Sequence, residues 1–322
     1  MLQNLLGLMA VMSFAPSPSP KLDLSRMYGQ PLPVQTTVAV DRSRLVEVRK
    51  PDILPTPKKK NANSAGIATT AKSVFVADVA SGGVLYAKNP HDVRSIASLT
   101  KLMTSLVLMD TEKKLDGDLT FLPEDFDREG GSEFNIGDTL PRKDVFKAML
   151  VGSVNEAAKA LARTSGIMMD EFVANMNQKA RDSHLDSLRF LEPTGLRSGN
   201  KGSAADIAAL ITIALRVPEV REVLNQPQAD ITTQAGKDYK VDTTNLLISS
   251  FLNKNPYKII GAKTGSLPEA GYCMAQVTRN TEGHEVVAVL LGSDNHFSRY
   301  SDIKKLTGWA FDSFDWPTQE SP

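Results

Sequence analysis

The sequence has no excess of charge of either sign, one cysteine and only four histidines. Its 37 basic residues match its 37 acidic ones, so it offers no electrostatic basis for binding nucleic acid. The lone cysteine, Cys273, cannot form an intrachain disulfide, and its setting in GYCMAQV predicts a buried strand residue rather than a reactive thiol. The histidines stand far apart, without the HxxxH or HxH spacing of a metal site, so we expect no metal and no cofactor.

The chain opens with an apolar stretch that is too short to cross a bilayer. LLGLMAVMSFA, residues 5–15, is well below the roughly 20 residues of a spanning helix. It matches a signal-peptide core with a small-x-small cleavage site at Ser13-Phe14-Ala15. We therefore expect residues 1–15 to be a signal peptide and the protein to be exported to the periplasm or cell envelope. No Lys or Arg precedes the run, which leaves a disordered apolar tail as the alternative.

Residues 16–69 are rich in proline, serine and charge, and they predict a disordered linker. The basic segment PTPKKK, residues 55–60, suits peripheral contact with an anionic membrane or cell-wall polymer, with a solvated spacer as the alternative. The composition from residue 70 onward is that of a globular protein. We expect one folded domain over residues 70–316 and a short tail over 317–322.

Hydrophobic periodicity predicts strands at both ends of this domain and helices between them. KSVFVADV alternates apolar and polar residues and, with the SGG turn and VLYAKN, predicts a β-hairpin. Helices are predicted after Ser98 and at 141–151, 155–165, 168–183, 203–216 and 298–314, and later strands at 257–264, 271–279 and 284–292. The pattern predicts an α+β fold: one antiparallel sheet built from both ends, the terminal helix on one face, and a helical lobe that leaves a cleft.

The pattern Ser-x-x-Lys occurs three times, and only one copy has a setting that suits catalysis. The copies are Ser98/Lys101, Ser198/Lys201 and Ser301/Lys304. The second lies in a polar, glycine-rich loop and the third inside an amphipathic helix. The first begins a buried helix and places both side chains on one face.

A serine hydroxyl is a poor nucleophile until a base takes its proton, and a lysine becomes that base only when its pKa falls far below 10.4. The first turn of a buried helix favours this, because it desolvates the amine and adds the positive end of the helix dipole. Free N–H groups there can also bind an oxyanion.

Two later motifs supply further groups. Ser153-Val154-Asn155 lies in a break between two predicted helices, where Asn155 could hold a peptide amide and Ser153 could relay a proton. Lys263-Thr264-Gly265-Ser266 follows the strand YKIIGA, where a strand end would present positive charge and hydrogen-bond donors to a cleft. Each motif is weak alone, and the order of the three carries the inference.

In this order the motifs resemble the low-molecular-mass penicillin-binding proteins of the D-alanyl-D-alanine carboxypeptidase/endopeptidase family. The resemblance spans residues 70–316 and includes SIASLTKLMT, RFLEPTGL, AKTGSLPEAGYC and KKLTGWAF. It implies a β-lactamase/transpeptidase-like fold, peptidoglycan muropeptides as substrates and β-lactams as inhibitors.

The resemblance also implies roles for individual residues. Ser98 would be the acylated nucleophile, Lys101 its base, and Ser153 the donor of a proton to the leaving amine. Asn155 would hold the substrate and Lys263 would supply positive charge. The substrate-binding residues would be Thr264, Gly265 and Ser266, with the backbone N–H groups of Ser98 and Ser266 as the oxyanion hole.

Two departures favour a DD-endopeptidase that cuts cross-links over the alternative of a carboxypeptidase. Glu285 aligns where the carboxypeptidases carry a basic residue, and the chain ends at DWPTQESP without their added β domain or membrane anchor. A class A-like β-lactamase stays open, with Glu192 as the carboxylate that would activate water. A non-hydrolytic sensor that binds muropeptides or β-lactams is the remaining alternative.

Overall fold

The computed structural model describes residues 54–64, 66–111, 115–127 and 131–317. The predicted signal peptide, residues 1–15, lies outside these ranges, as do most of the predicted linker and of the predicted tail. Within the described ranges, no helix is both long enough and apolar enough to cross a membrane.

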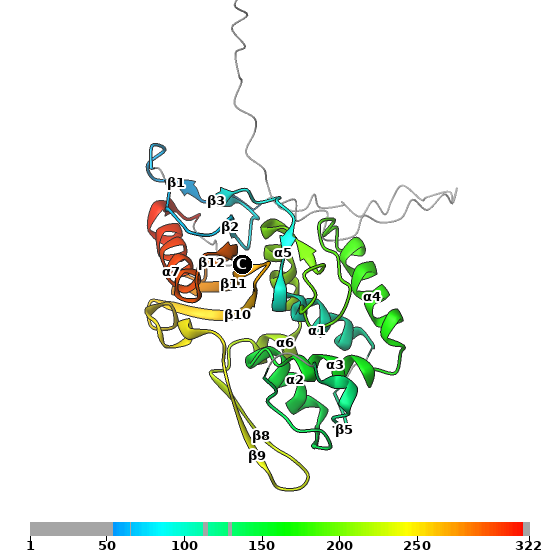
Figure 1. Cartoon of the computed structure of the whole chain (residues 1–322). Helices are drawn as coiled ribbons and strands as arrows, with labels where there is room; N and C mark the ends of the chain where they lie inside the picture. Colours follow the sequence, from blue (N-terminus) through cyan, green and yellow to red (C-terminus); the bar gives the residue numbers. More distant parts are fainter. Residues whose placement is uncertain (1–53, 65, 112–114, 128–130, 318–322) are drawn as a thin grey trace, which may run out of the picture.

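A five-stranded antiparallel sheet forms the centre of the domain (Figure 1). Its strands lie in the order β10 (Tyr257–Leu267), β11 (Gly271–Asn280), β12 (Glu285–Ser293), β2 (Ser73–Asp78) and β3 (Val84–Lys88). The pairing of β2 with β12 thus joins the hairpin β2–β3 to three strands from the end of the chain. Every residue of β2 is buried, because both faces of the sheet are covered.

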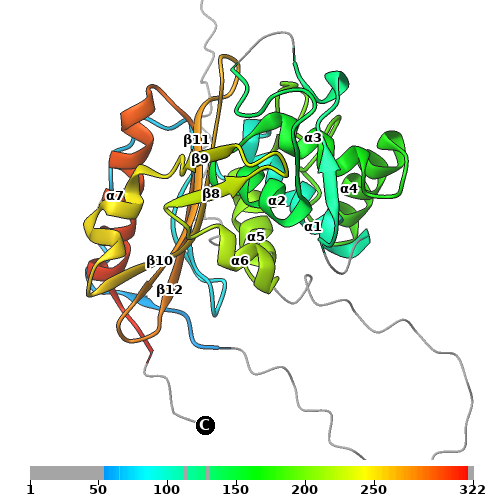
Figure 2. The same ribbon diagram turned by 90° about the horizontal axis from the view of Figure 1, so that it is seen from below.

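The helices lie on both faces of the sheet, as Figure 2 shows edge-on. The terminal helix α7 (His296–Ser313) covers one face and packs on a core that includes Val76, Met274 and Leu306. The other face packs on α5 (Ala204–Ala214), which is apolar almost all round and joins the sheet to the helical lobe. This is the predicted α+β arrangement, and the prediction is confirmed.

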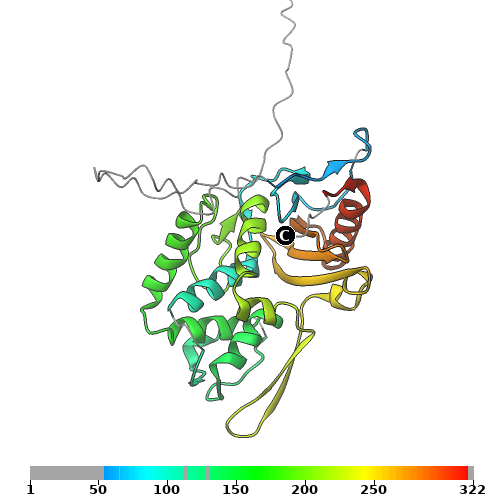
Figure 3. The ribbon, with the colours of Figure 1, turned by 180° about the vertical axis from the view of Figure 1, so that it is seen from behind.

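The helical lobe comes from the middle of the chain. Its helices are α1 (Thr100–Thr111), α2 (Arg142–Val151), α3 (Asn155–Arg163), α4 (Met169–Asp182) and α6 (Pro218–Val223). Short 3-10 turns occur at η3 (Ala97–Leu99), η4 (Pro123–Asp125), η5 (Leu246–Ser249) and η6 (Phe251–Asn253). Two-stranded pairs are formed by β4 (Arg94–Ser95) with β7 (Lys201–Gly202), by β5 (Asp118–Thr120) with β6 (Thr139–Pro141), and by β8 (Gln228–Thr232) with β9 (Asp238–Asp242). The β8–β9 hairpin, which the sequence analysis missed, projects from the lobe (Figure 3).

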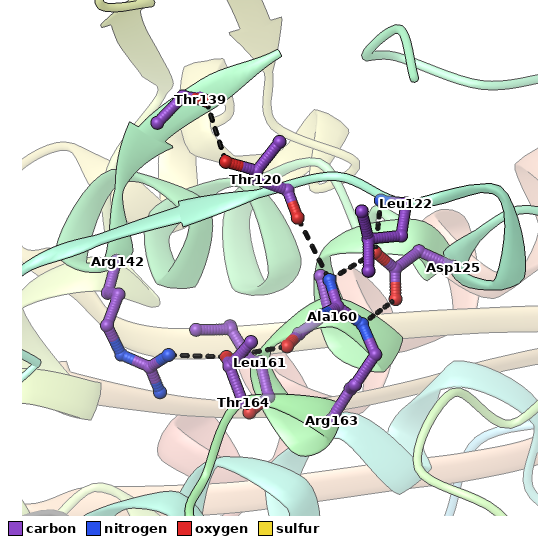
Figure 4. Close-up of polar contacts among 9 residues, drawn as sticks. All are labelled: Thr120, Leu122, Asp125, Thr139, Arg142, Ala160, Leu161, Arg163 and Thr164. Carbon is purple, nitrogen blue, oxygen red and sulfur yellow. Dashed lines mark hydrogen bonds and ion pairs between the residues drawn. The ribbon is translucent and has the colours of Figure 1, made fainter. Parts of the chain in front are cut away.

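An ion pair holds the C-terminal end of α3 (Figure 4). Arg163 donates two hydrogen bonds to the buried Asp125 carboxylate, of 2.8 and 2.7 Å, and a third to the Thr120 carbonyl. Asp125 also accepts the Leu122 N–H, so the loop before α2 is tied to α3. Because Asn155 is the first residue of α3, this ion pair helps to fix its position.

The predicted linker boundary at residue 69 is wrong. Strand β1 (Lys58–Lys59) pairs with β13 (Phe314–Asp315), so ordered structure begins before residue 60. The Lys59 ammonium lies 5.9 Å from the centre of the Trp309 ring, and Lys60 donates to the Asp312 carbonyl. This part of the basic segment therefore packs beside α7 rather than forming a free spacer.

Candidate active site

Ser98 lies in the 3-10 turn η3, which leads directly into α1. The preceding residue, Ala97, has a φ of 48°, a left-handed conformation that is costly for a residue with a Cβ. The Thr100 hydroxyl steadies the turn by donating to the Ala97 carbonyl at 2.8 Å. The serine therefore stands two residues before the α-helix, and the prediction that it begins a buried helical segment is confirmed.

The Lys101 amine is fully buried, and its Nζ lies 3.0 Å from Ser98 Oγ. Nζ also donates to Asn155 Oδ1 and to the Thr194 carbonyl, both at 2.7 Å. Burial lowers the pKa of Lys101 from 10.5 to about 7, against the opposing effect of Glu192 and other carboxylates. A neutral amine has two N–H groups and one lone pair. Because Asn155 and Thr194 take the N–H groups, the lone pair is left for the Ser98 proton.

Ser153 and Lys263 form the second contact of the site, with 2.6 Å between Ser153 Oγ and Lys263 Nζ. Ser153 has a φ of 63°, so two non-glycine residues at the site, Ala97 and Ser153, are in the left-handed region. Burial lowers the pKa of Lys263 well below its usual value, and the nearby Lys101 and Arg299 charges lower it further. The sequence predicted Lys263 at a strand end, whereas it lies inside β10, which extends to Leu267.

The strand β10 runs close beside the nucleophile turn. A Cβ on Gly265 would lie 2.9 Å from the Ser98 nitrogen and 3.0 Å from the Ile96 carbonyl oxygen, so only glycine allows this approach. Thr264 is held by a 2.7 Å contact between its hydroxyl and that of Thr244.

A cavity of about 390 Å³ lies over these residues. Most of the predicted site residues line it, namely Ser98, Ser153, Asn155, Thr264, Gly265 and Ser266. Lys101 and Lys263 lie behind it, in contact with Ser98 and Ser153. The structure thus brings together all eight residues that the motifs selected, while the oxyanion role of the Ser98 and Ser266 N–H groups stays a prediction.

The sequence analysis missed Arg299, which also lines this cavity from the first turn of α7. The residue is 4% exposed, and its guanidinium donates to the Gly265 carbonyl at 3.2 Å and to the Tyr300 hydroxyl at 2.7 Å. Within the described ranges it pairs with no carboxylate, and its Nε has no partner. A buried, unpaired guanidinium beside Thr264 suits a carboxylate ligand. The usable signal was the spacing of His296, Arg299 and Tyr300 at a helix start.

The structure contradicts the roles inferred for two acidic residues, Glu285 and Glu192. Glu285 begins β12 and binds Arg279 at 2.9 Å, at the end of β11 opposite to the nucleophile turn, so it says nothing about the charge at the site. Arg299, from a different element, places a cation there. Glu192 does not line the cavity, and its carboxylate accepts hydrogen bonds from its own turn, so the predicted β-lactamase base is not in place.

The other candidate reactive groups of the described ranges lie outside the cavity or are buried. Neither of the other Ser-x-x-Lys copies lines the cavity, and no group of three His, Cys, Asp or Glu residues there could hold a metal ion. Cys273 is fully buried in β11, as predicted, and burial raises the pKa of its thiol to about 11.

Comparisons with known proteins identify the family to which the chain belongs. Residues 58–295 match the family model described as D-alanyl-D-alanine carboxypeptidase. The D-alanyl-D-alanine endopeptidase of Pseudomonas aeruginosa is 30% identical over 240 residues, which cover 74% of this chain and 76% of the relative. The D-alanyl-D-alanine carboxypeptidase DacF of Bacillus subtilis is 28% identical over 264 residues, 80% of this chain and 66% of the relative.

Solved structures show the same fold. The Streptomyces K15 DD-transpeptidase has a TM-score of 0.70 at 25% identity, covering 77% of this chain and 99% of the other. Penicillin-binding protein D2 from Listeria monocytogenes, in its cefotaxime-bound form, has a TM-score of 0.66 at 27% identity, covering 76% and 99%.

Proposed function

The chain belongs to the D-alanyl-D-alanine carboxypeptidase family, and we propose that it hydrolyses D-alanyl peptide bonds of peptidoglycan through an acyl-enzyme on Ser98. The observation that carries this is the 3.0 Å contact between Ser98 Oγ and a buried Lys101 amine whose pKa is lowered to about 7. A lysine in that state can accept a proton at neutral pH, which is what an activated serine requires.

In acylation, Lys101 takes the hydroxyl proton and Ser98 Oγ attacks the carbonyl carbon of the D-alanyl residue. The backbone N–H groups of Ser98 and Ser266 would stabilise the oxyanion. The C–N bond then breaks as Ser153 donates its hydroxyl proton to the leaving nitrogen. The proton that Lys101 took from Ser98 passes to Ser153, so both groups return to their starting protonation states. The Ser153–Lys263 contact of 2.6 Å holds that donor in place.

In deacylation, a water molecule replaces the departed amine. Lys101 accepts a proton from the water, the resulting hydroxide attacks the ester carbonyl, and Ser98 Oγ leaves with a proton returned by Lys101. Ser98 and Lys101 thus serve in both half-reactions. β-Lactams would acylate Ser98 by the first half-reaction, in keeping with the relatives whose structures carry cefotaxime and ampicillin.

Arg299 and Thr264 would bind the carboxylate of the residue that leaves. Both residues line the cavity with Ser98, so they suit a leaving D-amino acid whose α-carboxylate is free. That leaving residue is either a terminal D-alanine or the residue whose amine forms a direct cross-link. The Arg299 guanidinium therefore suits the substrates of both carboxypeptidases and endopeptidases. We assign the protein to the endopeptidase branch because D-alanyl-D-alanine endopeptidases from two organisms are 30% and 29% identical to it over about three quarters of both chains.

Digestion of purified muropeptides, with the products weighed by mass spectrometry, tests this proposal. Conversion of cross-linked dimers to monomers, absent in Ser98→Ala, is the expected result. Release of D-alanine from pentapeptide monomers with no cleavage of dimers would assign the protein to the carboxypeptidase branch instead. Loss of a penicilloyl adduct within milliseconds would indicate a β-lactamase.

The substrate lies outside the cytoplasmic membrane, so the proposed function requires export. Residues 1–15 would supply the signal, and the periplasm or cell envelope would be the site of action. Cell fractionation of the full chain, with the mass of the mature N-terminus, tests both points. Peripheral contact of the basic N-terminal residues with a membrane or the wall stays a prediction.

A further inference from the structure

We propose that Glu192 is a positioning residue for the general base. Its carboxylate shapes the turn at 192–197 so that the Thr194 carbonyl accepts an N–H from Lys101 and the lone pair of the amine points at Ser98. The inference rests on the proposed function, since it assigns a role in the acylation step. Glu192 itself contacts neither Ser98 nor the cavity.

The Glu192 carboxylate is engaged by donors of its own turn. One oxygen accepts the Thr194 N–H at 2.6 Å and the Thr194 hydroxyl at 2.5 Å. The other accepts the Gly195 N–H at 2.7 Å and the amide of Asn200 at 3.0 Å. Asn200 is fully buried and also donates to the Glu192 carbonyl at 2.9 Å. These four charge-assisted hydrogen bonds hold the turn in one conformation.

This turn is attached to the first turns of α1. The Pro193 carbonyl accepts the Thr104 hydroxyl at 2.6 Å, and the next carbonyl, that of Thr194, accepts the Lys101 amine at 2.7 Å. Thr194 is fully buried, so no water can replace its carbonyl. If the turn changed shape, Lys101 would lose one of the two acceptors that orient its N–H groups, and its lone pair would no longer be fixed on Ser98.

The close contact of Gly195 with the nucleophile turn supports the same reading. Gly195 has a φ of 92°, and a Cβ there would lie 2.0 Å from the Ala97 carbonyl oxygen and 2.8 Å from the Ser98 nitrogen. The turn therefore contacts the nucleophile with its backbone and the base with a carbonyl. One carboxylate, that of Glu192, holds both in register.

The charge of Glu192 also affects the pH dependence of acylation, which a purely structural role would leave unchanged. Among the negative groups, Glu192 has the largest effect on the pKa of Lys101, followed by Glu156 and Asp127. All three raise this pKa, while burial lowers it. The Lys101 charge in turn lowers the pKa of the buried Lys263. Neutralising Glu192 therefore removes a stabilising charge and should move the protonation of Lys101 to lower pH.

The test is Glu192→Gln in the full chain, beside Glu219→Gln, an exposed residue of α6, as matched control. We would measure acylation by a fluorescent penicillin at pH 5–9, the lifetime of the adduct, and folding by circular dichroism. The expected result is acylation about 10- to 100-fold slower at pH 8, with an acidic limb displaced to lower pH. The adduct lifetime should lengthen by no more than acylation slows, because Lys101 is also the base for deacylation. A second variant, Asn200→Ser, keeps the charge and loses a donor, so its rate should fall with no such displacement.

Two results would overturn the inference. One is acylation by Glu192→Gln at the wild-type rate with the wild-type pH profile. The other is normal acylation followed by a long-lived adduct, which would make Glu192 a base for deacylation. Failure of the wild-type protein to form any adduct would instead count against the proposed acyl-enzyme function.

Discussion

The pH dependence of acylation follows directly from the burial of Lys101. With a pKa of about 7, the neutral fraction of the amine is about a tenth at pH 6 and about nine tenths at pH 8. Only the neutral form accepts the Ser98 proton, so the acylation rate should rise about tenfold between these pH values and then level off. A lysine at its usual pKa near 10.5 would give about a hundredfold rise over the same range and no plateau below pH 10.

Stopped-flow acylation with excess fluorescent penicillin measures this profile without the deacylation step. Circular dichroism at each pH provides the control, because unfolding at low pH would imitate the acidic limb. A logarithm of the rate that keeps climbing by one unit per pH unit up to pH 9 would refute the assignment of Lys101 as a base with a lowered pKa. A flat profile from pH 6 to pH 8 would refute it as well.

Three further outcomes are expected. Ser98→Ala should form no penicilloyl adduct by mass spectrometry while keeping the wild-type thermal midpoint; an adduct on another residue would contradict the nucleophile. Arg299→Ala should lower kcat/KM about 30-fold or more for peptides with a free carboxylate next to the cleaved bond, and far less for the amidated peptide, because one partner of a buried charge pair is lost. Gly195→Ala should lower the thermal midpoint and abolish acylation, since its Cβ would lie 2.0 Å from the Ala97 carbonyl oxygen. Gly236→Ala, with a similar φ of 80° but nothing within 4 Å, should cost only about 1–2 kcal/mol and leave acylation intact; equal effects of the two would refute the contact argument.

The lowered pKa values of Lys101 and Lys263 explain why two lysines can coexist in one buried site. Burial lowers the pKa of each, and the Lys101 charge lowers that of Lys263 further. Both amines then occupy the interior with hydrogen-bond partners rather than with carboxylate partners. The result is a site in which proton transfer does not require moving a fixed ion pair.

Local sequence patterns determined the fold class and selected most of the proposed catalytic residues. Helical and strand periodicity located the main elements, because one-sided burial imposes periods of 3.6 and 2 on the chain. Ser98 and Lys101 lie one turn apart, so their contact depends on a single helical segment. The later motifs could be ranked only by their order, since nothing local to Ser153 or Lys263 shows that their side chains meet.

The tertiary structure decided what long-range packing sets. The pKa of Lys101 depends on burial by elements far along the chain, and its orientation depends on the Thr194 carbonyl, which no side-chain motif reports. Arg299 reaches the site because α7 packs on β11 and β12 and its first turn extends to the Gly265 carbonyl of β10. Glu285, chosen by alignment, lies at the far end of its strand. The sequence selects residue types through local rules. The electrostatic potential and the distances between side chains at the site depend on neighbours that only the folded chain brings together.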